Sequence, residues 1–206
     1  MLSSRCFAHI VNLAAKAVIS AVTALNAVLL GETLDITRDP IAAVQALVRA
    51  IRGSSLRRHG FASVLKMLDK KVLQLVLDVD IRWSSTDIMI EWAIELREGI
   101  ELFLDKRDFT DLRKHKLSKD EWKALEIIHQ ILAVPHAFQQ KLSADKTPTL
   151  SLAIPSFRRM IQLWQGLKIT FPDAAPALDE GLEKLATYRE RLDIVPAYTL
   201  ATSEQI

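Results

Sequence analysis

The feature that most constrains this fold is the scarcity of turn-forming residues in a strongly hydrophobic chain. Of 206 residues only 6 are Gly and 7 are Pro, whereas 50% are hydrophobic. A β-sandwich or barrel needs many tight turns, so this composition favours long helices. The hydrophobic share also allows a sizeable core and argues against wholesale disorder. The sequence therefore predicts an all-α fold, an irregular array of about six to eight helices.

Apolar residues recur at helical spacing along most of the chain, and capping signals mark several helix starts. Asp39 precedes Pro40, a good N-cap beside a proline at the first helical position. Residues 118–121 read SKDE, a capping-box pattern, and Pro135 predicts a kink in the helix that follows. Helices are expected over residues 5–29, 40–51, part of 54–77, 88–104, from 119 past 132, 147–167 and 173–192.

Two segments are harder to assign. Residues 71–81, KVLQLVLDVDI, suit either a short strand or a helix end followed by an extended segment, and the flanking helical pattern favours the second. In residues 78–86, DVDIRWSST, Ser84 or Ser85 is the expected cap of the next helix. Ser84 and Asp87 have the spacing of a capping box.

The hydrophobic amino terminus is best explained as a buried amphipathic helix. Lys16 divides it, and residues 17–30 fall short of the roughly 20 apolar residues that a membrane span needs. A signal peptide or span is the alternative. The single cysteine, Cys6, excludes an intrachain disulfide and favours a reducing compartment. A net charge of +2 neither supports nor excludes a nucleic-acid partner.

Enzyme signatures are absent from the sequence, which has no glycine-rich phosphate loop, HExxH, GxSxG or CxxC. Cys6 and His9 form a C-x-x-H pair, but no second pair completes a zinc site. Asp78 and Asp80 alternate in an extended segment, so their side chains are expected on opposite faces. Such carboxylates do not make the cluster that metal-dependent phosphoryl transfer requires. We therefore predict neither catalytic residues nor a metal site.

Two features are compatible with nucleic-acid binding. The connector 106–119 is basic, and it either tracks a phosphate backbone, with Phe109 available for apolar contact, or is a solvated loop. Trp83 either packs as a hydrophobic staple at a helix entrance or stacks on an unpaired base, with Arg82 holding a phosphate. The basic residues of the connector are Lys106, Arg107, Arg113, Lys114, Lys116 and Lys119, offset by Asp108 and Asp111.

Two blocks in order resemble the hAT superfamily of transposases, especially its fungal members. RCFAHIVNLAAKAV resembles the family's C-x-x-H-x-x-N-L block, and DVDIRWSSTDIMIEWAIELREGI resembles its D-V-x-T-R-W-N-S-T-x-x-M-L block. LSKDEWKALEIIHQIL and PTLSLAIPSF are also similar, so the resemblance covers residues 5 to about 200. Ile81 and Ser84 depart from the usual threonine and asparagine of the second block.

The resemblance implies a ribonuclease H-like catalytic region interrupted by a large helical insertion. Residues 1–30 would be a helix of the core bearing C-x-x-H, and residues 31–206 the insertion domain. Trp83 would stack on a flipped base beside a DNA hairpin, with Arg82 as its companion and His9 near the scissile phosphate. Lys106, Arg107, Arg113, Lys114 and Lys116 are possible phosphate contacts. DNA, and other transposase-derived chains, would be the partners of this nuclear, non-membrane protein.

The family's catalytic Asp, Asp and Glu are expected outside this chain, upstream of C-x-x-H and beyond Ile206. The family uses divalent Mg or Mn, and we expect no cofactor to be bound by this fragment. We therefore expect a catalytically incomplete transposase fragment that retains weak DNA contact. Two alternatives stay open: a helical protein-interaction module without nucleic-acid binding, in which Trp83 is buried and the connector is a disordered loop, and a remnant without function.

Overall fold

The computed structural model describes residues 7–25, 36, 38–79, 83–144 and 150–192. Within these ranges all regular structure is helical, which confirms the all-α prediction. The chain forms two compact units, Met1–Leu25 with Gln130–Ile206 and Asn26–His129. The predicted division into a core helix (residues 1–30) and an insertion domain (residues 31–206) comes from the family resemblance, and it stays a prediction. The elements are α1 (Phe7–Leu25), α2 (Pro40–Arg52), α3 (Ser55–Met67), α4 (Trp83–Glu95), α5 (Arg97–Asp105), the 3-10 helix η1 (Arg107–His115), α6 (Lys119–Ala144), α7 (Leu150–Thr170), η2 (Pro172–Ala174) and α8 (Ala175–Leu192).

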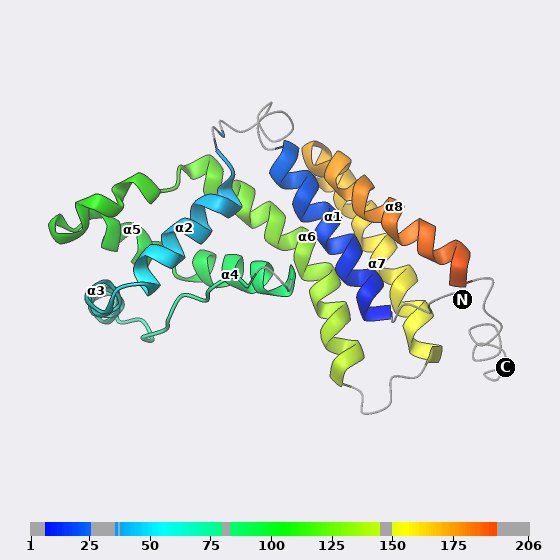
Figure 1. Cartoon of the computed structure of the whole chain (residues 1–206), viewed down its shortest axis with the longest axis horizontal. Helices are drawn as coiled ribbons and strands as arrows, with labels where there is room; N and C mark the ends of the chain where they lie inside the picture. The colour runs from blue at the N-terminus through cyan, green and yellow to red at the C-terminus, as the bar shows by residue number, and fades with distance from the viewer. Residues whose placement is uncertain (1–6, 26–35, 37, 80–82, 145–149, 193–206) are drawn as a thin grey trace. The chain divides into compact units, whose positions relative to one another are not determined.

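The first unit brings the first and last described helices together. Helix α1 packs along α8, and α7 also contacts α8 (Figure 1). The buried side chains of α1 recur every three to four residues and form one apolar stripe. This confirms the predicted buried amphipathic helix over the residues described. Those side chains are Ile10, Val11, Ala14, Ala15, Val18 and Val22.

A close approach of three helices centres on Gly181 of α8. A Cβ added there would lie 2.5 Å from Val18 Cγ2 and 2.7 Å from Trp164 Cζ3. The Trp164 ring is fully buried, and its indole N–H donates to the Ile131 carbonyl at 3.0 Å. Because this bond fixes the ring, only a glycine fits at position 181 without a shift of its neighbours.

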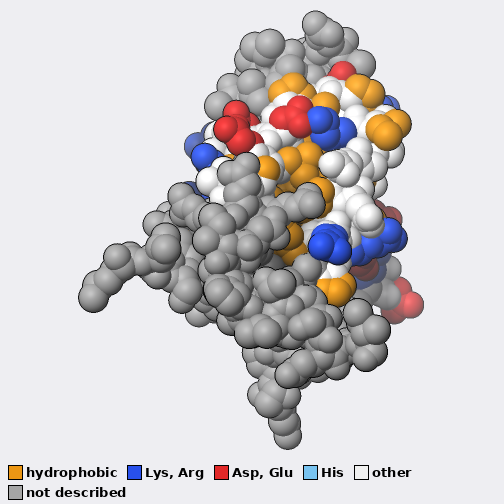
Figure 2. Space-filling view, turned by 90° about the vertical axis from the view of Figure 1, so that its right-hand side faces the viewer, with side chains coloured by type: hydrophobic (Ala, Val, Ile, Leu, Met, Phe, Trp, Pro, Cys, Tyr) orange, Lys and Arg blue, Asp and Glu red, His pale blue; other side chains and the backbone are white. Residues whose placement is uncertain are grey.

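The described part of one face of the molecule mixes residue types. On the face shown in Figure 2, hydrophobic side chains reach the surface between Lys or Arg and Asp or Glu side chains. Among the described residues, no helix is long and apolar enough to cross a membrane.

The second unit has an aromatic centre contributed by three elements. Phe61 of α3 meets Phe103 of α5 edge-to-face, with ring centroids 5.8 Å apart. Phe103 also lies 4.4 Å, centroid to centroid, from Phe109 of η1. Such aromatic pairs add to the stabilisation from buried area alone. They hold α3, α5 and η1 against one another.

The capping predictions for two helices are confirmed. The Asp39 carboxylate accepts a hydrogen bond from Ile41 N at 2.8 Å, with Pro40 at the start of α2. Glu121 N donates to Ser118 Oγ at 3.1 Å, and Ser118 N donates to Glu121 Oε2 at 2.7 Å, which completes a capping box. Pro135 lies inside α6, which continues to Ala144.

Helix α3 ends at Met67, earlier than the helix end expected within residues 71–81. Residues 70–79 run without a helix or strand, as the extended part of that interpretation predicted. Asp69 has a φ of 53°, and Lys70 N donates to the Leu65 carbonyl at 2.9 Å. Asp69 N also donates to the Lys66 carbonyl at 3.1 Å. These bonds make a Schellman ending, in which Asp69 takes the left-handed position that glycine usually occupies.

Candidate nucleic-acid interface

Two hydroxyl residues of DVDIRWSST, Ser85 and Thr86, form hydrogen bonds within the protein. Thr86 Oγ1 donates to the Asp78 carboxylate, at 3.1 Å from Oδ1 and 3.0 Å from Oδ2. Ser85 Oγ also bonds to Asp78, and Gln45 Nε2 of α2 donates to Asp78 Oδ2 at 2.6 Å. Asp78 thus ties the extended segment to α2 and to the first turn of α4.

Ser85 makes a second connection to the same segment. Val79 N donates to Ser85 Oγ at 2.9 Å, and this hydroxyl also lies 2.9 Å from the Val79 carbonyl. The prediction that Ser84 or Ser85 caps α4 is wrong, because the helix already begins at Trp83. The Ser84–Asp87 capping box does not form either, since Asp87 is directed to His129 instead.

Trp83 is enclosed at the entrance of α4. Its side chain is only 3% exposed, so the indole is not open to solvent in this conformation. The structure thus agrees with the alternative in which Trp83 is buried. Arg82, its predicted companion, lies outside the described residues. Base stacking by Trp83 stays a prediction that requires the first turn of α4 to open.

The C-x-x-H pair is only partly described. His9 lies exposed on α1, whereas Cys6 lies outside the described residues. His9 belongs to the first unit and Trp83 to the second. Its role near a scissile phosphate therefore stays a prediction. Within the described ranges, no group of three or more His, Cys, Asp or Glu could hold a metal ion.

A buried acid–imidazole pair links α4 to α6. His129 Nδ1 lies 2.9 Å from Asp87 Oδ1, and the Asp87 side chain is 1% exposed. The hydrogen bond that His129 donates to Asp87 raises the pKa of His129; burial opposes this, while the charges of Asp87 and Glu91 add to it. The two residues are 42 positions apart, and nothing in the local sequence marks them as partners.

The basic connector is an ordered element rather than a loop. Residues 107–115 form the 3-10 helix η1, interrupted by non-helical angles at Phe109. Phe109 and Leu112 are buried beneath it, so Phe109 is not available to a ligand, contrary to the prediction. Their spacing of three residues is the signal that could have revealed η1, because such residues share one edge of a 3-10 helix.

The cations of the connector lie on its outer side. Arg107, Arg113, Lys114 and Lys116 are exposed, and Lys106 is half-buried. Lys116 Nζ lies 2.7 Å from Asp105 Oδ1, and Arg113 donates to the Asp105 carbonyl at 3.4 Å. These contacts hold Lys116 and Arg113, two of the five predicted phosphate-binding side chains, against Asp105.

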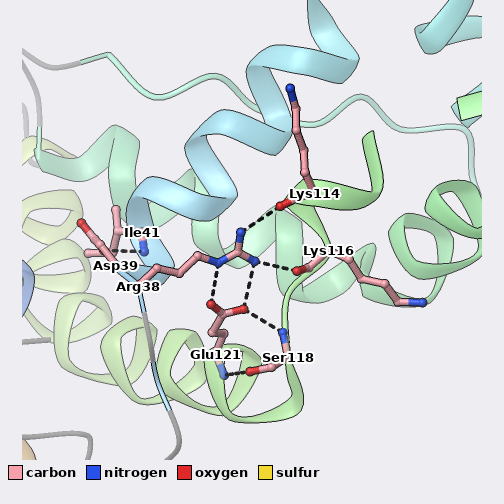
Figure 3. A network of polar contacts seen from close by, with 7 residues as sticks. All are labelled: Arg38, Asp39, Ile41, Lys114, Lys116, Ser118 and Glu121. Atoms are coloured by element: carbon pink, nitrogen blue, oxygen red, sulfur yellow. Dashed lines mark hydrogen bonds and ion pairs between the residues drawn. The ribbon is translucent and has the colours of Figure 1, made fainter. Parts of the chain in front are cut away.

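Arg38 fastens η1 to the rest of the second unit (Figure 3). Its Nη1 donates to the Lys114 carbonyl at 3.0 Å, and its Nη2 to the Lys116 carbonyl at 2.6 Å. The same guanidinium makes a bidentate pair with Glu121, at 2.7 Å through Nε and 3.1 Å through Nη2. One side chain thereby joins the start of α2, the end of η1 and the start of α6.

The pKa of each partner reflects this pairing. The Glu121 hydrogen bond raises the pKa of Arg38. Burial raises the pKa of Glu121. The hydrogen bonds from Arg38 and Ser118 N, together with the Arg38 charge, lower this pKa by more than burial raises it, so the net shift is downward. Both groups are therefore charged at neutral pH, and η1 is held by an ion pair whose carboxylate is 5% exposed.

The surroundings of His115, the last residue of η1, are electropositive. Burial lowers the pKa of His115, and the charges of Lys114, Arg38 and Arg57 lower it further. Only Asp111 acts in the opposite direction. Arg57 of α3, Arg38 just before α2 and Lys114 of η1 therefore lie near this point, although they are far apart in the sequence.

Comparisons with known proteins agree with the broad resemblance. Residues 4–131 match the model of the ZBED1 RNase-like helical domain. The chain is 24% identical over 149 residues to the zinc finger BED domain-containing protein RICESLEEPER 2 of Oryza sativa subsp. japonica. That match covers 72% of this chain but only 18% of the relative. No solved structure matches the chain.

The family model covers more than half of the chain, including α1 to α5, η1 and the first half of α6. This supports the coarser part of the predicted resemblance, a transposase-derived helical region related to the hAT superfamily. The fungal type and the alignment of the individual blocks stay predictions. The chain belongs to the ZBED1 RNase-like helical domain family.

Proposed function

We propose that this chain is the helical part of a hAT-type transposase-derived protein and that it contacts DNA through the outer side of η1. The observation that carries the proposal is the construction of η1. Its apolar residues are buried, and Arg38 donates to the Lys114 and Lys116 carbonyls at its end, so the backbone that carries its cations is fixed at the surface. A backbone that is already ordered loses less conformational entropy on meeting phosphates than the backbone of a mobile loop does.

Arg107 and Lys114 are the leading phosphate contacts. Both are exposed, and within the described part of the chain neither forms an ion pair. Lys116 must exchange Asp105 for a phosphate, and Lys106 is half-buried. We expect binding to be weak and strongly dependent on salt, because only a few phosphates are neutralised.

The finer parts of the resemblance belong to the same proposal. Strand cleavage would require carboxylates and divalent Mg or Mn supplied outside this chain, so the chain alone would not cut DNA. Trp83, Arg82 and His9 would approach the cleavage site in a larger assembly with other transposase-derived chains. Such an assembly would act in the nucleus.

A titration of the chain into fluorescently labelled, hairpin-ended duplex DNA at several salt concentrations tests the proposal. Each phosphate contact contributes roughly 0.9 to the slope of log K against log salt concentration. Arg107→Gln/Lys114→Gln should therefore lower the slope by roughly 2. Lys123→Gln, an exposed lysine on α6, is the matched control and should leave it unchanged. Equal slopes for all three proteins would refute the role of η1.

The same titration tests base stacking by Trp83. Loss of affinity in Trp83→Ala for hairpin-ended DNA, but not for a blunt duplex, supports stacking on an extruded base. Equal affinity of the variant and the unmodified chain for the hairpin counts against it. A change in both affinities together with a lower unfolding midpoint indicates that the buried ring acts only on stability.

A helical protein-interaction module is the second candidate, and the burial of Trp83 favours it. An open apolar groove of about 320 Å³ between α6 and α7 also suits this function. Phe138, Met160 and Leu163 line the groove, with Arg159 beside them. The order of η1 runs against this candidate, which expected a disordered connector. Absence of salt-dependent DNA binding would favour the interaction module.

A further inference from the structure

Helix α3 presents a basic face that the proposed interface does not yet include. Phe61, Val64 and Leu65 are buried on one side of the helix. His59 and Lys66 are exposed on the other side, and Arg58 is exposed at the edge of the buried side. At about 100° per residue, these three side chains fall within an arc of roughly 100°.

This face is free of acidic residues along the helix. No Asp or Glu occurs from residue 40 to residue 68, and the first one beyond is Asp69. Among the described residues, two carboxylates of other elements form ion pairs with cations in or just after the helix. Asp111 lies 2.7 Å from Arg57 Nη2, and Glu98 lies 2.8 Å from Lys70 Nζ. The outward cations of α3 are therefore not neutralised by their own helix.

Arg58 is also held in place and lies beside a second arginine. Its guanidinium donates to the Arg52 carbonyl at the end of α2, and Arg52 in turn bonds to Gln74. Both arginines line a small cavity of about 60 Å³, together with Gln74 and apolar residues. None of the residues lining this cavity is acidic. Two guanidinium groups beside a polar amide provide suitable donors for a phosphate oxygen.

Helix α3 adjoins η1, so the two basic surfaces are neighbours. A Cβ at Gly60 would lie 2.7 Å from the Phe109 ring, which shows that the helix backbone touches η1. The ion pair between Arg57 and Asp111 joins the same two elements. Burial lowers the pKa of His115, and the charge of Arg57 from α3 adds to those of Lys114 and Arg38 in lowering it further.

We infer that the outward face of α3 binds the sugar-phosphate backbone of duplex DNA, as a second row of contacts beside η1. The inference rests on the proposed function and extends it to Arg52, Arg58 and Lys66. From Arg58 to Lys66 the helix rises roughly 12 Å. One DNA strand places a phosphate roughly every 3.4 Å along its axis, so this face spans about three phosphates.

The test compares salt slopes for the 206-residue chain and its variants on a labelled duplex. Lys66→Gln should lower the slope by roughly 0.9, and Arg58→Gln/Lys66→Gln by roughly 2. Lys66 is exposed and outside the packed side of α3, so the single variant keeps the test valid if the double variant unfolds. Lys123→Gln again serves as the control.

The outcomes separate this inference from the proposed function. If Arg107→Gln/Lys114→Gln lowers the slope but the α3 variants match Lys123→Gln, the α3 face is refuted and the η1 interface stands. If the unmodified chain shows no salt-dependent binding, both are refuted. If poly-glutamate displaces the duplex at equal charge concentration, the α3 face recognises acidic chains in general, which overturns a DNA-specific role.

Discussion

Gly181 and Gly166 allow the packing of the first unit to be tested by one chemical change at two sites. Both glycines lie inside helices, α8 and α7, and both belong to the first unit. Replacing a helix-interior glycine by alanine favours the helix by about 1 kcal/mol. At Gly166 nothing lies within 4 Å of the new Cβ, so Gly166→Ala should raise the free energy of unfolding by about that amount.

Gly181→Ala should have the opposite sign. Its methyl group would lie 2.5 Å from Val18 Cγ2, and 2.7 and 3.1 Å from two atoms of the Trp164 ring. Overpacking of this kind lowers the free energy of unfolding by about 1–3 kcal/mol. We expect a cost of about 2–3 kcal/mol here, because the hydrogen bond from the Trp164 indole to the Ile131 carbonyl keeps the ring from moving away. After the gain in helix propensity, a net loss of about 1–2 kcal/mol remains.

Urea unfolding followed by far-UV circular dichroism measures both changes. The two variants should differ by about 2–3 kcal/mol in the free energy of unfolding, because they share the propensity gain and differ in the clash. A Gly181→Ala protein as stable as Gly166→Ala would show that α1, α7 and α8 do not meet as closely as described.

Three further predictions concern the second unit. Glu121→Gln should lower the free energy of unfolding by about 2 kcal/mol at neutral pH, less than for a fully buried pair because Arg38 is 37% exposed. Since the folded pKa of Glu121 is below 4.5, its contribution is present above pH 4.5 and is lost as the pH falls through the folded pKa, as an acid titration of stability would show. The folded pKa of His129 is above 6.5, so its contribution to the free energy of unfolding is present below pH 6.5 and is lost as the pH rises through the folded pKa. His129→Gln should flatten this part of the curve of stability against pH. Acrylamide should quench Trp83 less than Trp92, which is half-buried; comparing Trp83→Phe with Trp92→Phe measures this, and equal quenching contradicts an enclosed Trp83.

The helices were predictable where their signals are local. Asp39 with Pro40, and Ser118 with Glu121, mark helix starts within a few residues, and both starts are confirmed. The end of α3 carries a weaker signal, because an aspartate takes the left-handed position instead of glycine. The order of η1 was missed because its charged residues outnumber the two apolar residues that anchor it.

The candidate site depends on contacts that no local pattern encodes. Arg38 and Glu121 are 83 residues apart, and Gln45 lies 33 residues from Asp78. Trp83 occupies a helix entrance, where packing by neighbouring elements decides whether the ring is enclosed. The sequence identifies the cations. Only the fold shows which elements bring them together near His115.

The pairing of α1 with α8 bears on how the chain folds during synthesis. The second unit, Asn26–His129, is continuous and can fold as soon as it leaves the ribosome. Helix α8, which covers the apolar stripe of α1, is made about 150 residues after α1. At roughly 5–20 residues per second, that stripe waits on the order of 10 s for α8. A nascent chain stalled before residue 175 would therefore recruit chaperones through α1.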